Sequence, residues 1–450
     1  MRKFGSVCSG IEAASLAFAS FGWEAAWLAE VDVDASAVLA HRFGATRPVY
    51  PPTFEDDPAD KKNGRTAAQK AATRQRAAKK VAWGDRITNW GDMTLIADAV
   101  RRGAAEAPDM LCGGTPCQAF SVAGNRQGLA DARGNLSLTF CELADAIDDA
   151  RATRGEEPCV VTWENVDGAL TSKDNAFGCI LAALAGEVLP LEPPGGRWTN
   201  AGVVLGPRRA VAWRVGDAQY FGVAQRRKRV YLVASARDGF DPAAVLLEWE
   251  GVRRDSAPSR EARQVAAAET AVGADDRSGR AGAGDRTGAG GLVGGGRPAG
   301  LEAFGGGYQG GAIEVATTTT TTKDRIDFDS QTFVVHGTQD PIVQHECAMP
   351  FGRNTGQENA VLVFDPTQMA AVRRLMPIEC ERLQGMPDNW TLVPVGKGEA
   401  ADSPRYKQVG NSWAVPHAAW VCRRLTAHLD ALDARDDTIL PAEIYWLLAA

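Results

Sequence analysis

The chain is 450 residues long and 45% hydrophobic, which suffices for a large folded core with a second lobe and excludes a disordered or collagen-like polymer. No apolar run approaches the roughly 18 residues of a membrane helix, and the first residues show no signal-peptide pattern. The nine cysteines are scattered without a CxxC pair. We therefore expect a soluble, cytoplasmic protein with neither a disulfide framework nor a metal. The net charge of −7 argues mildly against a nucleic-acid partner, although clustered basic residues can still bind one.

The first half of the chain alternates short β-like runs with amphipathic helical ones. In chain order we expect a strand at 4–8, a helix at 11–20, a strand at 27–31, a helix at 34–43, a strand at 109–112, a helix through 136–147, and strands at 159–163, 210–215 and 230–234. Such alternation predicts an α/β fold whose mostly parallel, doubly wound, Rossmann-like sheet carries helices on both faces. Ligands bind at the carboxyl ends of these strands, so the loops after Cys8, Val31, Cys112 and Trp163 should carry the chemistry.

The composition changes near residue 236. Residues 272–322 are rich in Gly, Ala, Arg and Asp and end in a threonine run, which indicates either a flexible segment or the polar loops of a separate lobe. A last helix through 414–425 has the spacing to pack back on a core. We expect a catalytic domain at 1–237 with an insert at about 54–83, a smaller loop-rich lobe at 238–368, and a returning C-terminal part at 369–450.

Two clusters of basic residues stand out against the negative net charge. Residues 61–80 hold eight lysines and arginines and no acid, and residues 225–229 (QRRKR) hold four cations in five positions. The first cluster is equally compatible with a solvated helix face and with contact to a DNA backbone. The second suits phosphates or the carbonyl edge of a base, or else a charged edge strand.

A cysteine on a stiff loop is the first candidate for chemistry. Residues 112–121 (CGGTPCQAFS) follow a buried strand directly; the two glycines allow close approach of a ligand, and Pro116 stiffens the backbone before Cys117. Cys117 is therefore a candidate nucleophile, with a structural cysteine in a tight turn as the alternative. Glu164 ends the next strand, where a carboxyl group can exchange a proton with a bound base; alternatively it is a helix cap or a surface acid.

The N-terminal turn from strand to helix is the candidate cofactor site. Residues 8–12 (CSGIE) resemble the first turn of nucleotide-binding sheets but lack the full GxGxxG pattern, so a nucleoside without phosphates fits better than a dinucleotide. Glu30, after the second strand, is placed to bind a ribose, and Asp92 to take an adenine amino group. Each acid alone is compatible with ordinary surface or cap chemistry.

Taken together, these segments strongly resemble the C5-cytosine DNA methyltransferase family, over residues 1–235 and 370–425. The matching blocks, in family order, are 8–13 (CSGIEA), 114–124 (GTPCQAFSVAG), 164–166 (ENV), 225–229 (QRRKR), 374–379 (RLMPIE), 382–388 (RLQGMPD) and 410–416 (GNSWAVP).

The resemblance implies that S-adenosyl-L-methionine donates a methyl group, without a metal, to carbon 5 of a cytosine flipped out of double-stranded DNA. Cys117 would add to carbon 6, Glu164 would contact N3 of the base and Arg227 its carbonyl, with Gln118 and Arg229 beside them. The implied cofactor-binding residues are Cys8, Ser9, Gly10, Ile11, Glu12, Glu30, Val31, Asp92, Met93, Pro116, Leu136, Asn411 and Ser412. The lobe at 238–368 would recognise the target sequence. A monomer is expected, and a restriction endonuclease encoded elsewhere in a bacterium or phage is a compatible partner.

The sequence departs from the family pattern near the cofactor turn. Glu12-Ala13 stand where two glycines are usual, Val7-Cys8 where an aliphatic residue and Phe are usual, and the insert at 54–83 is long. Three other functions stay open. A redox enzyme would need a resolving cysteine or a phosphate-binding glycine pattern, and a silent DNA-binding relative would not need Cys117, Glu164 and Arg227 intact. A tRNA-directed member would share these blocks, and the long insert before Arg374 favours DNA over it.

Overall fold

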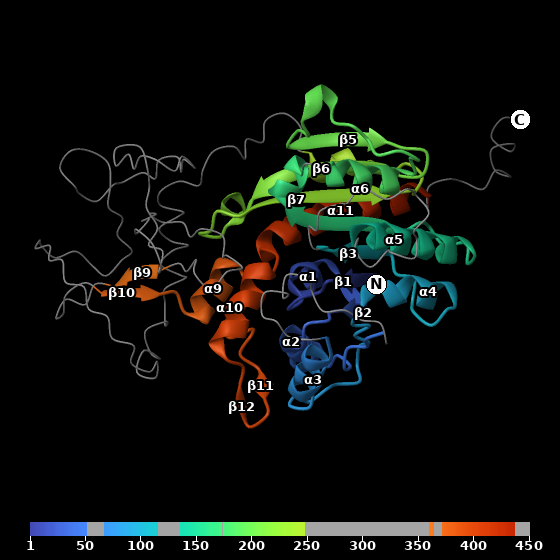
Figure 1. Ribbon diagram of the computed structural model, residues 1–450. Coiled ribbons are helices and arrows are strands. Elements are labelled where there is room, and N and C mark those ends of the chain that lie inside the picture. The colour runs from blue at the N-terminus through green and yellow to red at the C-terminus, as the bar shows by residue number, and fades with distance from the viewer. Residues whose placement is uncertain (52–66, 116–135, 173, 248–359, 364–370, 437–450) are drawn as a thin grey trace, which may run out of the picture.

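A seven-stranded sheet forms the centre of the protein (Figure 1). The computed structural model describes residues 1–51, 67–115, 136–172, 174–247, 360–363 and 371–436. In the order of the sheet the strands are β2 (Trp23–Ala29), β1 (Arg2–Val7), β3 (Met110–Gly113), β4 (Val160–Val166), β7 (Lys228–Ser235), β6 (Ala210–Asp217) and β5 (Ala201–Leu205). Two small antiparallel pairs lie apart from it: β9 (Ala360–Val363) with β10 (Ala371–Arg374), and β11 (Pro394–Val395) with β12 (Gly398–Glu399).

The sheet has a parallel half and an alternating half. Strands β2, β1, β3 and β4 are parallel, whereas β7 is antiparallel to β4, β6 to β7, and β5 to β6. Because β6 therefore points the same way as β4, only β7 and β5 are reversed, and the predicted mostly parallel α/β sheet is confirmed. Val7 pairs with Gly113 and Gly113 with Trp163, so the loops after β1, β3 and β4 leave the sheet side by side.

Helices cover both faces of the sheet, as a doubly wound fold requires (Figure 1). On one face, α4, α5 and α6 pack over side chains such as Leu111 and Val161. On the other, α1, α7 and α11 pack over Met110 and Val160, the neighbours that alternate with them along β3 and β4. The helices are α1 (Ala13–Phe18), α2 (Val33–Phe43), α3 (Ala67–Ala78), α4 (Ile96–Arg101), α5 (Leu136–Ala152), α6 (Ala176–Ala185), α7 (Pro242–Leu246), α9 (Pro377–Leu383), α10 (Asp402–Asn411) and α11 (Val415–Asp436).

Most of the expected elements are present with shifted ends. The strand expected at 27–31 runs instead from Trp23 to Ala29, and the helix expected at 11–20 begins two residues later, at Ala13. The final helix is confirmed as α11, whose buried Ala418, Val421 and Leu425 follow a helical spacing. Helix α6 and strand β5 had no counterpart in the sequence analysis.

The C-terminal segment returns to the N-terminal turns. Trp390 Nε1 donates to the carbonyl oxygen of Ile11 at 2.9 Å, and Lys407 Nζ pairs with Asp32 Oδ2 at 2.7 Å. The Arg42 guanidinium donates to the carbonyl of Trp390 at 3.0 Å and lies over its ring. These contacts pack the segment that includes α9 and α10 against the beginning of α1 and against both ends of α2.

Residues outside the described ranges include Pro116, Cys117 and Gln118, most of the lobe expected at 238–368, and the first part of the basic cluster at 61–80. Within the described part of the chain no helix is long and apolar enough to cross a membrane. The same part contains no group of three acidic, histidine or cysteine side chains suited to a metal ion.

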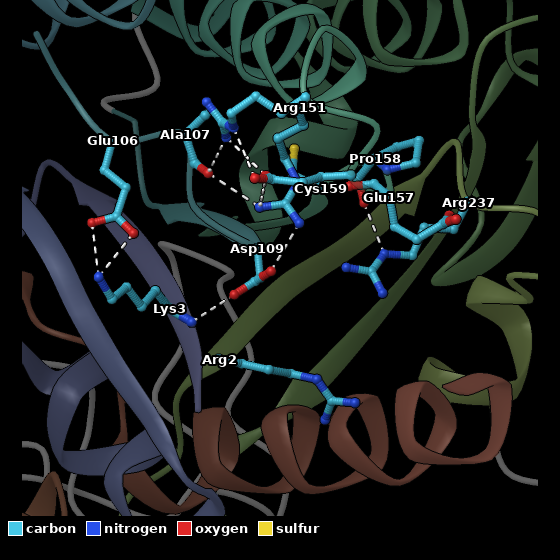
Figure 2. A network of polar contacts seen from close by, with 12 residues as sticks. Arg2, Lys3, Glu106, Ala107, Asp109, Arg151, Glu157, Pro158, Cys159 and Arg237 are labelled. Carbon is cyan, nitrogen blue, oxygen red and sulfur yellow. Dashed lines mark hydrogen bonds and ion pairs between the residues drawn. The ribbon is translucent and has the colours of Figure 1, made fainter. Parts of the chain in front are cut away.

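The amino edge of the sheet is closed by a polar network (Figure 2). Arg151 of α5 donates to Asp109 Oδ1 at 2.9 Å and to the carbonyls of Ala107 and Glu157 at 3.1 and 2.6 Å. The other oxygen of Asp109 accepts the backbone N–H of Lys3 at 2.8 Å. This network fixes the starts of β1, β3 and β4 relative to one another.

Candidate functional site

The turn after β1 is shaped by a buried glutamate. Glu12 is fully buried, has φ +61°, and caps α1: its carboxylate accepts the Ser15 N–H at 3.2 Å and the Ser6 hydroxyl at 3.0 Å. A left-handed backbone costs about 1–2 kcal/mol for a residue with a β-carbon, so the cap compensates for the missing glycine. Burial raises the pKa of Glu12 to about 7, against the effect of these hydrogen bonds.

Glu30, at the end of β2, faces this turn. Its Oε2 accepts the N–H of Gly10 and its Oε1 the N–H of Asp32, both at 2.7 Å. Its own N–H donates to Asn89 Oδ1 at 2.9 Å. Burial raises the pKa of Glu30 to about 7, and Asp32 adds to this effect. The carboxylate is thus held at the turn, and each oxygen keeps a second lone pair that can accept from a ribose hydroxyl.

Cys8, Asp92 and Met93 come together beside Glu30. Cys8 Sγ lies 3.9 Å from Met93 Sδ, and Asp92 Oδ1 accepts the N–H of Thr94 at 3.0 Å. Burial raises the pKa of the Cys8 thiol, and the nearby carboxylates of Glu30 and Asp92 raise it further. The loops after β1 and β2 and the turn at 91–93 therefore meet, as the sequence analysis expected.

The remaining described residues of the expected cofactor set take varied positions. Ser9 bridges β1 and β2, since its hydroxyl donates to the Ser6 carbonyl and accepts the Ala29 N–H. The side chain of Ile11 is buried, the carbonyl of Val31 accepts the Tyr50 hydroxyl at 2.7 Å, and Leu136 begins α5. Pro116 lies outside the described residues.

This arrangement fits a nucleoside. Gly10 has φ +55°, and among the described residues no atom other than those of its chain neighbours lies within 4 Å of the position that a β-carbon would take there, so the turn is open in front of it. Carboxylates at Glu30 and Asp92 provide acceptors, and no lysine or arginine belongs to the turn at 8–13 that would hold a phosphate. Open space with acidic acceptors suits ribose and adenine groups rather than a dinucleotide.

The residues that lead into the loop of Cys117 are fixed by buried hydrogen bonds. The Thr115 hydroxyl lies 2.7 Å from the Ser137 hydroxyl and accepts the Trp163 indole N–H at 2.9 Å. Asn165 Nδ2 donates to the Thr115 carbonyl at 2.8 Å. Sequence reasoning had singled out Pro116, Cys117 and Gln118 of this loop, all outside the described residues, and it missed the part that Thr115, Ser137 and Asn165 play in holding it.

Glu164 forms a buried ion pair with Arg229. The carboxylate oxygen Oε1 lies 3.0 Å from Arg229 Nε, and Oε2 lies 3.1 Å from the position that a β-carbon on Gly114 would take. Burial raises the pKa of Glu164 above its ordinary value, although the charges of Arg229 and Arg227 oppose the shift. The Glu164 carboxylate thus faces Gly114, which precedes the loop of Cys117.

Arg227 is held against the end of α10. Its Nη2 donates to the carbonyls of Gly410 and Ser412 at 3.1 and 2.6 Å, and the whole side chain is buried. Burial and the neighbouring Arg229 lower the pKa of Arg227 to about 9. Arg227 therefore anchors the turn after α10, in which Asn411 is exposed and Ser412 buried, and Arg229 is the arginine that pairs with the acid.

A polar hollow of about 190 Å³ lies beside the ion pair, where β6 ends and β7 begins. Its lining includes Lys228, Arg214, Tyr220 and Asn200. Lys228 is exposed and adjoins Arg229 in sequence, so the hollow and the ion pair share one edge of the sheet. The sequence analysis treated residues 225–229 as one block. In the structure Arg227 binds the turn at 410–412, Arg229 pairs with Glu164, and Lys228 lines the polar hollow.

Comparison of the sequence with known proteins identifies a matching family and several relatives. The family model described as C-5 cytosine-specific DNA methylase matches residues 83–243 and 301–427. The protein named DNA N-6-adenine-methyltransferase of Escherichia phage P1 is 37% identical over 94% of this chain and 61% of its own length. Type II methyltransferase M.HpaII of Haemophilus parainfluenzae is 26% identical over 73% of this chain and 74% of its own. M.AquIA of Picosynechococcus sp. is 33% identical over 32% of this chain and 52% of its own. The chain thus spans only part of the phage P1 relative.

Proposed function

The chain belongs to the C-5 cytosine-specific DNA methylase family, and on that premise we propose that it transfers a methyl group from S-adenosylmethionine to carbon 5 of cytosine in double-stranded DNA. The observation that carries the proposal is the buried Glu164–Arg229 ion pair at the carboxyl edge of the sheet. It faces Gly114, three residues before Cys117. A proton donor and a cation thereby flank the base of the loop that bears the thiol.

Carbon 5 of cytosine is a weak nucleophile until a thiolate adds to carbon 6. In the proposed reaction the Cys117 sulfur forms a bond to carbon 6, the ring's 5,6 double bond shifts its electrons, and carbon 5 becomes enamine-like. After carbon 5 has gained its methyl group it loses its proton, and Cys117 leaves as thiolate. An unperturbed thiol has a pKa of roughly 8.5, so only a few per cent is thiolate at neutral pH; activation of the base must therefore assist the addition.

Glu164 is proposed to supply that activation at N3. Because burial raises its pKa, a larger fraction of Glu164 is protonated at neutral pH than of an exposed glutamate, and the protonated form donates to N3 as the ring accepts electrons. Arg229 holds the carboxylate through Nε and is proposed, in place of Arg227, to contact the base carbonyl. Arg227 instead acts as a positioning residue through the turn at 410–412.

The described residues that would hold the methyl donor are those of the turn after β1, with Glu30 for the ribose and Asp92 and Met93 near the adenine. When bound, S-adenosylmethionine supplies an electrophilic methyl group on a positively charged sulfur. Glu30 is already oriented by Gly10 and Asp32, so binding adds contacts to a preformed carboxylate.

The substrate base is stacked inside a duplex and must be flipped out, at a cost of a few kcal/mol that protein contacts offset. Lys228 and Arg214 at the polar hollow are suitable for a backbone phosphate next to the flipped nucleotide. We further propose that residues 238–368 recognise the target sequence, that the protein acts as a monomer, and that it works in the cytoplasm, with or without a partner endonuclease.

The test is to incubate the protein and its Cys117→Ala variant with methyl-labelled S-adenosylmethionine and mixed-sequence duplex DNA, and to digest the DNA to nucleosides. The proposal predicts label in 5-methylcytosine with wild type and none with the variant. Binding of the methyl donor without label in DNA would contradict it, and parallel reactions with tRNA and with DNA-binding measurements would then separate a tRNA-directed enzyme from a silent DNA-binding relative.

The name of the phage P1 relative favours a second candidate, methylation of adenine at N6. An exocyclic amino group can attack a methyl donor without a covalent thiol adduct, so this activity would survive Cys117→Ala. The same digest distinguishes the two reactions, because label would then appear in N6-methyladenine for both proteins. The cysteine loop and the family match favour cytosine for the chain itself.

A further inference from the structure

One aromatic side chain stands where the expected cofactor turn, the nucleophile loop and the acid converge. Trp413 lies in the turn between α10 and α11 and is partly exposed. Its indole nitrogen lies 3.1 Å from the position that a β-carbon on Gly114 would take, and so does Glu164 Oε2. The indole and the carboxylate therefore face each other across Gly114.

The position of Trp413 is fixed from several sides. Its ring meets Tyr231 edge-on, with centroids 6.0 Å apart, and lies 6.5 Å from the ring of Phe18 on α1. It also packs against the cluster that contains Ile11 and Ala13 of the turn after β1. Arg227 binds the carbonyl of the preceding Ser412 at 2.6 Å. The ring is thus held beside Gly114, against Tyr231 and Phe18, by contacts that precede any ligand.

A methyl group passing from a donor at the turn after β1 to a base at Glu164 must cross the space beside Gly114, because the ends of β1, β3 and β4 are adjacent in that order. The sulfur that carries it has a full positive charge. None of the described residues of the expected cofactor set, from Cys8 to Glu12 and at Glu30, Val31, Asp92 and Met93, offers an aromatic face. Trp413 does, and tryptophan is the best aromatic partner for a cation.

We propose that the Trp413 ring binds the positively charged sulfonium of the methyl donor by a cation–π contact, and so distinguishes the donor from its neutral thioether product. The inference rests on the proposed function and adds to it a residue that favours substrate over product. The contact is lost when the methyl group leaves, because the thioether has no charge. Exchange of product for fresh donor would follow from the same chemistry.

The test measures equilibrium binding of S-adenosylmethionine and S-adenosylhomocysteine by calorimetry to wild type, Trp413→Phe and Trp413→Leu. Cation–π contacts in desolvated sites contribute up to about 2 kcal/mol, so Trp413→Leu should weaken the charged ligand about tenfold and the neutral one less than about twofold. Trp413→Phe should retain most of the preference. Trp198→Leu serves as the matched control: this ring is also partly exposed but packs on Phe177 and Trp213, and its loss should leave the affinity ratio unchanged.

A second measurement does not depend on how a variant folds. Replacing all twelve tryptophans biosynthetically with a fluorinated analogue withdraws charge from the ring face at nearly constant shape, and should reduce the affinity ratio of charged to neutral ligand. Equal weakening of both ligands by Trp413→Leu, or an unchanged ratio in the fluorinated protein, would overturn the cation–π contact. Wild-type protein that binds neither ligand would instead contradict the proposed function.

Discussion

The two edges of the central sheet use buried charge in opposite ways. At the amino edge, the Arg151 guanidinium donates hydrogen bonds to Asp109 and to two backbone carbonyls, and Arg237 donates to the carbonyl of Pro158 at 2.8 Å (Figure 2). At the carboxyl edge, Arg227 Nε and Nη1 and Gln225 Oε1 are buried without a hydrogen-bond partner among the described residues.

Unsatisfied buried polar atoms cost free energy, typically about 1–3 kcal/mol each. Among the described residues the amino edge avoids this cost and gains rigidity, whereas the carboxyl edge combines these unsatisfied atoms with carboxyl groups whose pKa values burial raises, those of Glu12, Glu30 and Glu164. The difference indicates that the amino edge serves stability and the carboxyl edge serves chemistry. An amino-edge variant that loses mainly activity, or a carboxyl-edge variant that loses mainly stability, would contradict this comparison.

The largest effect is expected for Glu164→Gln at the carboxyl edge. Loss of the proton donor should lower kcat about 10²- to 10³-fold, and the loss of stability should be limited because the amide oxygen of the introduced Gln can still accept from Arg229. Because the wild-type pKa is raised and the protonated form is the active one, the wild-type rate should fall as pH rises through that pKa, and the variant should lose this falling limb. Methylation rates from pH 5 to 9 check both points. A fully active variant would remove Glu164 from the chemistry.

The counterpart at the amino edge is Arg151→Met. Removing a buried guanidinium leaves Asp109 and two carbonyls without their donor, so the free energy of unfolding should fall by about 3 kcal/mol, with kcat unchanged below the melting range. The matched control is Arg154→Met on the following turn, whose half-exposed ion pair with Glu156 should contribute under about 1 kcal/mol. Urea unfolding gives the values; a kcat loss in Arg151→Met would blur the distinction between the edges.

Glu12 links the carboxyl edge to stability through pH. Its pKa is about 7 in the fold and 4.5 as a free side chain, so the folded state binds the proton more tightly. Stability is therefore lost as pH rises from about 4.5 to about 7, by up to about 3 kcal/mol. Glu12→Gln should remove the contribution of Glu12 to this pH dependence of stability. The contribution of Glu30, whose pKa is also raised by burial, should remain. Parallel curves for wild type and variant from pH 4 to 8 would contradict a protonated Glu12.

The smallest effect is expected for Lys228→Ala at the polar hollow. Loss of one phosphate contact should weaken DNA binding a few-fold, equally for all sequences, and reduce the slope of log K against log salt by about 1. Lys3→Ala, at the opposite edge and paired with Glu106, is the control and should leave the slope unchanged. Binding titrations at several salt concentrations test this, and equal slopes for Lys228→Ala and wild type would remove the phosphate from the hollow.

The sequence predicted the parallel half of the sheet and the loops that meet at its carboxyl edge, because short strand-like runs alternate there with amphipathic helical segments along the chain. It did not predict β5, whose outward residues are exposed and whose two strongest strand formers are only Val203 and Val204. The local pattern also could not distinguish the roles of Arg227 and Arg229. The Arg227 side chain donates to the carbonyls of residues 410 and 412, which lie some 180 positions away in the sequence.

Two further positions of the site depended on contacts that no local pattern contains. Glu12 adopts a glycine-like backbone because Ser6 and Ser15 bind its carboxylate. Trp413 lies beside Gly114 and packs against the cluster that contains Ile11, in a region where α11 packs on α1. Spacing within one block reveals neither arrangement, since each depends on how distant segments meet.

The most direct test of the assignment of chemistry to the carboxyl edge uses duplex DNA in which the target cytosine carries fluorine at carbon 5. Fluorine cannot leave as a proton does, so after methyl transfer the cysteine should stay bonded to carbon 6. The account predicts a denaturation-resistant protein–DNA complex with S-adenosylmethionine, mapped by mass spectrometry to Cys117, slowed in Glu164→Gln and absent in Cys117→Ser. Absence of a complex with wild-type protein that binds both ligands, or a complex that persists in Cys117→Ser, would contradict it.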